Sequence, residues 1–163
     1  MSGILDAFKL DGKVALVTGS ERGLGRGMAV ALAQAGADIV GVTHTAEAPE
    51  TAAAIEATGR KYVHVQANLL SIEPIEGVVA KAVEAFGHID ILVNNAGIIM
   101  RNDSVDFTEK EWDDVMNINV KTVFFMCQAV ARQFIKQGTG GKIVNIASML
   151  SFQGGILVPG YTA

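Results

Sequence analysis

The apolar positions of the chain form five short runs, and longer segments of helical periodicity separate them. The runs begin with VALVT at Val14 and continue at residues 38–42, 62–66, 90–93 and 142–146. Short runs rich in Val and Ile that are bounded by glycine or polar residues predict β-strands. We therefore expect five strands.

The first strand leads into a glycine turn and then into an amphipathic segment that ends near Ala37. A second helix is predicted over residues 46–58, where Gly59 stops it. A third is predicted from the capping residue Ser71 through residue 86, with a proline tolerated in its first turn.

The longest helical region begins at Thr108. Thr108 and Glu111 have the spacing of a capping box, and helical periodicity continues from there to Gln137, with a predicted break near Asn117. Residues 1–12 form an arm that precedes the first strand.

Strands that alternate with helices, without an internal linker, predict right-handed crossovers and a parallel sheet covered on both faces. The predicted fold class is α/β, a doubly wound Rossmann-type sheet in one domain of 163 residues. With 50% hydrophobic and 18% charged residues, the chain has the composition of a globular protein.

The charge and the composition exclude several kinds of partner. A net charge of −4 provides no basic surface for nucleic acid or for an anionic membrane. The chain opens without a signal peptide and has no apolar run of membrane length, so we expect a cytoplasmic protein. Cys127 is single and so cannot form an internal disulfide. It lies in the apolar segment VFFMCQAV, where we expect a core residue rather than a reactive thiol, and we expect no metal ion.

Candidate chemistry begins at the glycine turn. Gly19, Gly23 and Gly25 stand where a strand-to-helix turn needs a sharp bend, close approach of a ligand and tight helix packing. Such glycines also occur in plain turns, but a strand before them and a helix after them favour a diphosphate site at the helix N-terminus. The remaining turn residues predicted to contact the cofactor are Ser20, Arg22 and Leu24.

Polar residues also follow the later strands. In a sheet of this type, ligands bind at the carboxyl ends of the strands. Asn68 and Leu69 follow the third strand, the sequence Asn95-Ala96-Gly97 follows the fourth, and Ser148 and Tyr161 follow the fifth. A tyrosine, a serine and an asparagine at one edge suit proton transfer to and from a carbonyl oxygen.

These motifs together resemble the short-chain dehydrogenase/reductase family. The resemblance runs from about residue 8 onward through TGSERGLG, NNAG, the asparagine in MNINV, IVNIAS and the late tyrosine. Segments such as FGHIDILVNNAGIIMR and GGKIVNIASMLSFQGG are most similar to members that act on sugar acids.

The resemblance assigns roles to individual residues. It implies that Tyr161 is the catalytic acid/base, that Ser148 binds the substrate oxygen and that Asn119 supports a proton-relay water. It implies that the residues from Gly19 to Gly25 and Asn95 to Gly97 hold a nicotinamide cofactor. It further implies a cytoplasmic homotetramer.

The predicted reaction is hydride transfer between NAD(H) and a hydroxyl or keto group of a sugar acid. The carboxylate of the sugar acid is expected to pair with a cation. Arg101 is the candidate for this cation, and Gln153 is a candidate polar contact. Both could equally be surface residues. Trp112 and the Phe124-Phe125-Met126 group are expected in the core or at a subunit interface.

The sequence leaves the choice of cofactor open. The acid that normally marks NAD, about 20 residues past the glycine turn, is absent, because the second strand ends Gly41-Val42-Thr43-His44. Arg22 could bind the 2′-phosphate of NADP or could be solvated. His44 could contact the adenosine or simply be exposed, and Asn68 could bond the adenine through its side-chain amide. The resemblance favours NAD, with NADP as the alternative.

The family pattern also includes a lysine four residues after the tyrosine, and residue 163 is the last of this sequence. We expect that the C-terminal part of the family fold is absent from these residues. Either they belong to a longer enzyme, which we favour, or they form a non-catalytic nucleotide-binding fragment. A short-chain reductase of another ketone or of an acyl thioester, using NADPH, is a further alternative.

Overall fold

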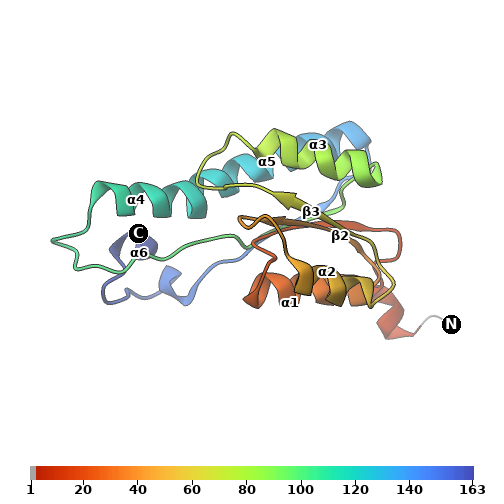
Figure 1. Ribbon diagram of the computed structural model, residues 1–163, viewed down its shortest axis with the longest axis horizontal. Helices are drawn as coiled ribbons and strands as arrows, with labels where there is room; N and C mark the ends of the chain where they lie inside the picture. The colour runs from red at the N-terminus through yellow and green to blue at the C-terminus, as the bar shows by residue number, and fades with distance from the viewer. Residues whose placement is uncertain (1–2) are drawn as a thin grey trace.

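The computed structural model describes residues 3–163 and contains one parallel sheet of five strands in the order β3-β2-β1-β4-β5 (Figure 1). Each neighbouring pair is parallel. The predicted doubly wound α/β class is confirmed, and the strand bounds differ from the predicted ones by at most one residue. The strands are β1 (Val14–Thr18), β2 (Asp38–Thr43), β3 (Tyr62–Gln66), β4 (Ile91–Asn94) and β5 (Lys142–Asn145).

Helices cover both faces of the sheet. Figure 1 shows α1 and α2 on one face and α3 and α5 on the other, whereas α4 and α6 lie beyond the carboxyl ends of the strands. The α-helices are α1 (Gly23–Gln34), α2 (Pro49–Glu56), α3 (Ile75–Phe86), α4 (Glu109–Met116), α5 (Thr122–Gln137) and α6 (Pro159–Thr162). Short 3-10 turns are η1 (Ile4–Phe8) and η3 (Met149–Ser151), and η2 (Asn117–Lys121) is π-helical.

Two predicted helix starts are wrong. The helix expected from residue 46 begins at Pro49, because the Thr45 hydroxyl donates to the Glu47 carbonyl (2.8 Å) and holds the preceding residues in a turn. The Ser71 hydroxyl caps no helix. It accepts from the amide of Glu73 (3.2 Å), and α3 starts only after Pro74.

The long helical region follows its prediction closely. The capping box at its start is confirmed, since the Thr108 hydroxyl accepts from the Glu111 amide and the Glu111 carboxylate accepts from the Thr108 amide. The predicted break near Asn117 is a π-helical turn that joins α4 to α5 without interrupting the helical path. Such turns often occur at functional sites.

The core consists of two clusters, one on each face of the sheet. Leu16, Val40 and Leu92 belong to the cluster under α3 and α5, whereas Ala15 and Ile39 belong to the one under α1 and α2. Each fully buried large aliphatic side chain stabilises the fold by about 1.5–3 kcal/mol. Because β1 is buried along its whole length, its carboxyl end is held rigidly where the glycine turn begins.

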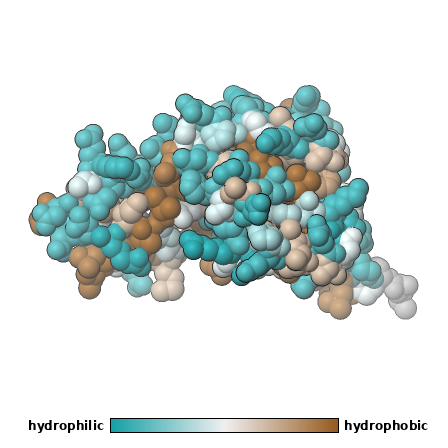
Figure 2. Space-filling model, in the orientation of Figure 1, coloured by the Kyte–Doolittle hydropathy of each residue, from teal (hydrophilic) through white to brown (hydrophobic). Residues whose placement is uncertain are grey.

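Apolar side chains of the long helical region divide between the core and the surface. Met126 is fully buried and Cys127 packs partly buried against the first cluster, as expected of core residues. Phe124 is 61% exposed and Trp112 is 41% exposed, so neither is a core residue. On the face of the molecule drawn in Figure 2, apolar side chains are exposed at the end where α4 and α6 lie. Within residues 3–163, every helix is too short or too polar to cross a membrane.

Candidate nucleotide-binding and active site

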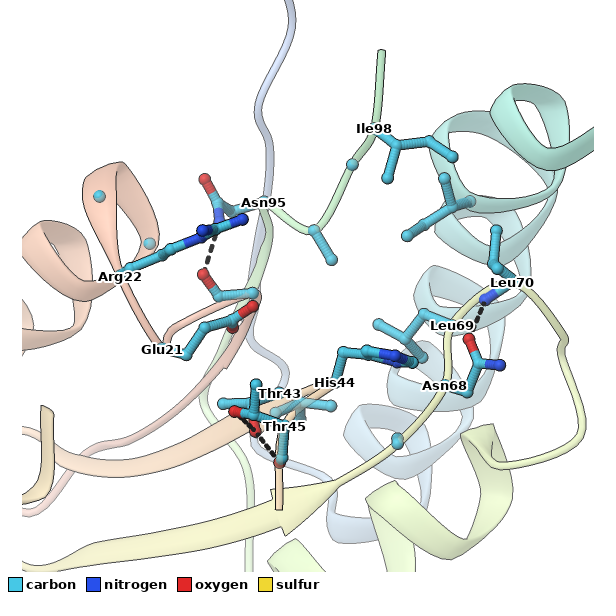
Figure 3. Close-up of a pocket in the computed structure, with 18 of the residues that line it drawn as sticks. Glu21, Arg22, Thr43, His44, Thr45, Asn68, Leu69, Leu70, Asn95 and Ile98 are labelled. Carbon is cyan, nitrogen blue, oxygen red and sulfur yellow. Dashed lines mark hydrogen bonds between the residues drawn. The ribbon is translucent and has the colours of Figure 1, made fainter. Parts of the chain in front are cut away.

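A cavity of about 720 Å³ opens at the carboxyl edge of the sheet (Figure 3). The glycine turn, the end of β2 and the segments after β3 and β4 form its walls. Its lining residues are Gly19, Glu21, Arg22, Gly23, Leu24, Gly25, Val42, Thr43, His44, Thr45, Ala67, Asn68, Leu69, Leu70, Asn95, Ala96, Gly97, Ile98, Met100, Asp114 and Ile118.

The glycine turn has the shape of a phosphate cradle, and its three glycines are needed for different reasons. Gly19 and Gly23 have φ values of +66° and +55°. Residues with a Cβ atom are strained in this left-handed conformation, and glycine is not. At Gly23 an added Cβ would meet no atom within 4 Å, so the protein itself requires only the conformation there. At Gly25 a Cβ would overlap the Gly19 carbonyl and lie 2.5 Å from the side-chain nitrogen (Nδ2) of Asn95.

Thr18 clamps the two loops that border the cavity. Thr18 is 2% exposed, and its hydroxyl accepts hydrogen bonds from the backbone amides of Asn95 and Ala96, both at 3.0 Å. In return, the Asn95 side chain donates to the carbonyls of Thr18 (3.0 Å) and Gly19 (3.1 Å). The segment after β4 and the glycine turn are therefore one hydrogen-bonded unit. Sequence reasoning missed Thr18, although a polar residue that ends an apolar strand was a usable signal.

Asn119 fixes the next part of the same wall. It lies in the π-helical turn, where its side-chain oxygen accepts from the Ile98 amide (2.9 Å) and its nitrogen donates to the Ile98 carbonyl (2.8 Å). A Cβ on Gly97 would lie 2.9 Å from that side-chain oxygen. The protein therefore uses the Asn119 side chain to hold the loop after β4, and the π-helical turn brings it there.

Another wall of the cavity is formed by the segments that follow β2 and β3. His44 and Asn68 are exposed in the cavity, and Figure 3 shows the His44 ring directed towards the Leu69 segment. The Asn68 side-chain oxygen accepts from the Leu70 amide at 3.1 Å. The Thr122 hydroxyl donates to the Leu69 carbonyl at 2.8 Å and ties this segment to α5.

Most residues predicted to bind the cofactor line this cavity, with one exception. They are Gly19, Arg22, Gly23, Leu24, Gly25, His44, Asn68, Leu69, Asn95, Ala96 and Gly97. Ser20 does not line it, because its side chain is fully buried beneath the turn. The lining residues that sequence reasoning missed include Thr43, Thr45, Leu70, Ile98 and Asp114, whereas Glu21 was covered only as part of the turn from Gly19 to Gly25.

The residues predicted to carry catalysis and substrate binding lie outside the cavity lining. The Ser148 hydroxyl caps η3 by accepting from the Leu150 amide (3.2 Å), and its own O–H can still donate. Tyr161 is half-buried on α6, which packs against α4. Arg101 and Gln153 are exposed.

Residues 13–163 match the family described as short chain dehydrogenase. The chain belongs to this family. It is 61% identical over 160 residues to the 2-dehydro-3-deoxy-D-gluconate 5-dehydrogenase of Escherichia coli strain K12, covering 98% of this chain and 63% of that protein. This chain therefore spans less than two thirds of that relative's length.

Solved structures of family members share the fold. A proposed 2-deoxy-D-gluconate 3-dehydrogenase from Agrobacterium tumefaciens, crystallised with NADP, is 46% identical with a TM-score of 0.84, covering 95% of this chain and 61% of that one. A short-chain dehydrogenase/reductase from Mycobacterium marinum is 33% identical with a TM-score of 0.95, covering 99% and 66%.

Members of this family use NAD(P), and the cavity fits such a dinucleotide. At Gly23, which lines the cavity, the space that a Cβ would take is open, and the first amides of α1, which have no intrahelical acceptor, lie at the same turn, where a diphosphate could bind. Among residues 3–163, no group of three potential metal ligands is found.

Proposed function

We propose that this chain is the Rossmann-type domain of an oxidoreductase that transfers hydride between NAD(H) and a hydroxyl or keto group of a sugar acid. The observation that carries the proposal is the cavity at the carboxyl edge of the sheet, where the clamped glycine turn and NNAG segment form a cradle for a dinucleotide. When bound, the nicotinamide ring supplies or accepts the hydride.

In this proposal the polar residues after β5 handle the proton. During oxidation, Tyr161 takes the proton from the substrate hydroxyl as the hydride leaves its carbon. During reduction, it returns a proton to the forming alkoxide. Ser148 donates its O–H to the substrate oxygen, and Asn119 keeps the loop after β4 in place beside the reacting groups.

The proposed substrate class rests on the names of the relatives, which act on 2-dehydro-3-deoxy-D-gluconate. A sugar acid carries a carboxylate, and Arg101 is the proposed cation that meets it, with Gln153 as a neighbouring polar contact. Both are exposed on segments near α6, and the Asn102 amide, next to Arg101, donates to the Leu157 carbonyl (2.9 Å). We also propose a homotetramer, because exposed Phe124 and Trp112 offer apolar surface on α4 and α5.

The test is to measure binding and turnover separately in the intact protein. Titration with NADH, followed by fluorescence, should saturate, and NAD should be reduced with 2-dehydro-3-deoxy-D-gluconate as the substrate. Tyr161→Phe should abolish turnover while leaving the dissociation constant for NADH unchanged. Turnover by Tyr161→Phe at the wild-type rate would overturn the catalytic assignment, and absence of NADH binding would overturn the whole proposal.

A second candidate function is nucleotide binding without catalysis. The observation in its favour is that Ser148 and Tyr161 lie outside the lining of the cavity. Saturable NADH binding together with no turnover of sugar acids, neutral ketones or acyl thioesters would select this function.

A further inference from the structure

The end of β2 presents no carboxylate to the cavity. The residues that line it there include Thr43, His44 and Thr45. In dinucleotide-binding sheets of this type, an acid near this point accepts a hydrogen bond from the adenosine ribose 2′-hydroxyl. The recognition of that hydroxyl must therefore come from another part of the wall.

Two nearby acids do not supply it. Asp38 begins β2 at the opposite end of the strand, where its carboxylate accepts from the Lys61 amide (2.9 Å) and pairs with Arg60 (2.9 Å). Glu47 is exposed and does not line the cavity. Asp38 is thus paired at the far end of β2, and Glu47 lies outside the cavity lining.

Glu21 has the required position. It comes from the glycine turn, lines the cavity and, in Figure 3, lies between Arg22 and Thr43. Of the described residues that line the cavity, Glu21 and Asp114 carry carboxylates, and Asp114 is paired with Lys110. Glu21 is thus the cavity acid for which no ion pair is found within residues 3–163.

One carboxylate oxygen of Glu21 is buried without a partner. Its Oε2 is shielded from water and accepts no hydrogen bond from the described residues. A buried acceptor left unpaired is costly, so a rotation of the Glu21 side chain that brings the carboxylate to a donor in the cavity is favoured. The backbone beneath is held in place, because the buried Thr51 hydroxyl donates to the carbonyls of Ser20 (2.8 Å) and Glu21 (3.4 Å).

From these observations, and resting on the proposed function, we propose that Glu21 binds the adenosine ribose and makes the site select NAD(H) over NADP(H). The Glu21 carboxylate accepts hydrogen bonds from the ribose hydroxyls. A 2′-phosphate removes one of these donors and places a second negative group beside the carboxylate, which repels it. The selecting acid thus comes from the glycine turn instead of from β2.

Arg22 favours the opposite choice of cofactor, NADP(H). Its guanidinium is exposed at the same wall and could pair with a 2′-phosphate, and the Agrobacterium relative binds NADP. The proposal states that the charge of Glu21 outweighs this attraction. Because Arg22 is solvated, its pairing with a phosphate is screened more strongly than a contact with the half-buried Glu21.

The test compares dissociation constants for NADH and NADPH in the wild type, Glu21→Gln, Glu21→Ser and the control Glu47→Gln. We expect the wild type to bind NADH at least about tenfold more tightly, which is the effect of one good polar contact. Both Glu21 variants should reduce this ratio by about tenfold or more, mainly by tightening NADPH binding. The Glu47→Gln control should keep the wild-type ratio.

The outcomes separate this inference from the proposed function. A wild type that binds both dinucleotides but prefers NADPH, or Glu21 variants that keep the wild-type ratio, would overturn the role of Glu21 alone. A wild type that binds neither dinucleotide would overturn the proposed function and this inference together. An equal change of ratio in Glu47→Gln would show a general charge effect and would also overturn the inference.

Discussion

Replacing Thr18 by valine should uncouple the two loops that form the cradle. Valine keeps the shape of threonine but removes the hydroxyl that accepts from the Asn95 and Ala96 amides. A buried donor left without an acceptor costs about 1–3 kcal/mol. Because both amides are partly buried, we expect Thr18→Val to lower the free energy of unfolding by about 2–4 kcal/mol. That is a large share of the 5–15 kcal/mol that is typical of a domain.

The matched control is Thr18→Ser, which keeps the hydroxyl and removes one methyl group. Its expected cost is about 1 kcal/mol, from the lost apolar burial alone. Urea unfolding followed by circular dichroism measures both variants, and NADH titration should show that only the valine variant weakens binding. If the valine variant were no less stable than the serine variant, the clamp would not be the interaction that holds the loops.

Two further substitutions test other parts of the structure. Gly25→Ala places a methyl group against the Gly19 carbonyl, so we expect this variant to lose NADH binding. In the control Gly27→Ala the added Cβ meets no atom within 4 Å, and NADH should bind normally. Loss of NADH binding in both variants would contradict the role of the glycine turn. Hydrogen bonds from the Thr108 backbone and hydroxyl lower the pKa of Glu111 below its ordinary value of 4.5. This lowered pKa contributes stability above pH 4.5 that is lost as the pH falls through the folded-state value. Unfolding curves of the wild type and Glu111→Gln should therefore differ at pH 7 and converge in acid, and a constant difference would refute the linkage.

The architecture followed from local patterns in the sequence. Strand runs such as VALVT are buried on both faces, and a parallel order leaves few ways to connect them with right-handed crossovers. The capping box at Thr108 was predictable because both of its partners lie within one helical turn. Helix starts at residues 46 and 71 were wrong, because side-chain hydrogen bonds within turns outweighed the propensity of the neighbouring residues.

The site was predictable only where its signal is local. The glycine turn carries its meaning in a few adjacent residues, and the structure places it on the cavity wall. The function of Thr18 depends on Asn95, 77 residues away, and that of Asn119 on a π-helical turn that brings it to Ile98. Ser20 shows the opposite case, since a residue in the right motif is buried beneath the cavity.

The strand order has a consequence for synthesis of the protein. The central strand β1 pairs with β2 soon after it in the chain, but its other edge pairs with β4, and the Val14 amide meets Asp90 76 residues later. At a translation rate of about 5–20 residues per second, the ribosome needs about 4–15 s to synthesise the residues between β1 and its partner β4. During that time this edge of β1 has no partner strand. The most deeply buried strand of the finished sheet is thus an open, apolar edge in the nascent chain. We expect early translation intermediates to be where chaperones engage this protein.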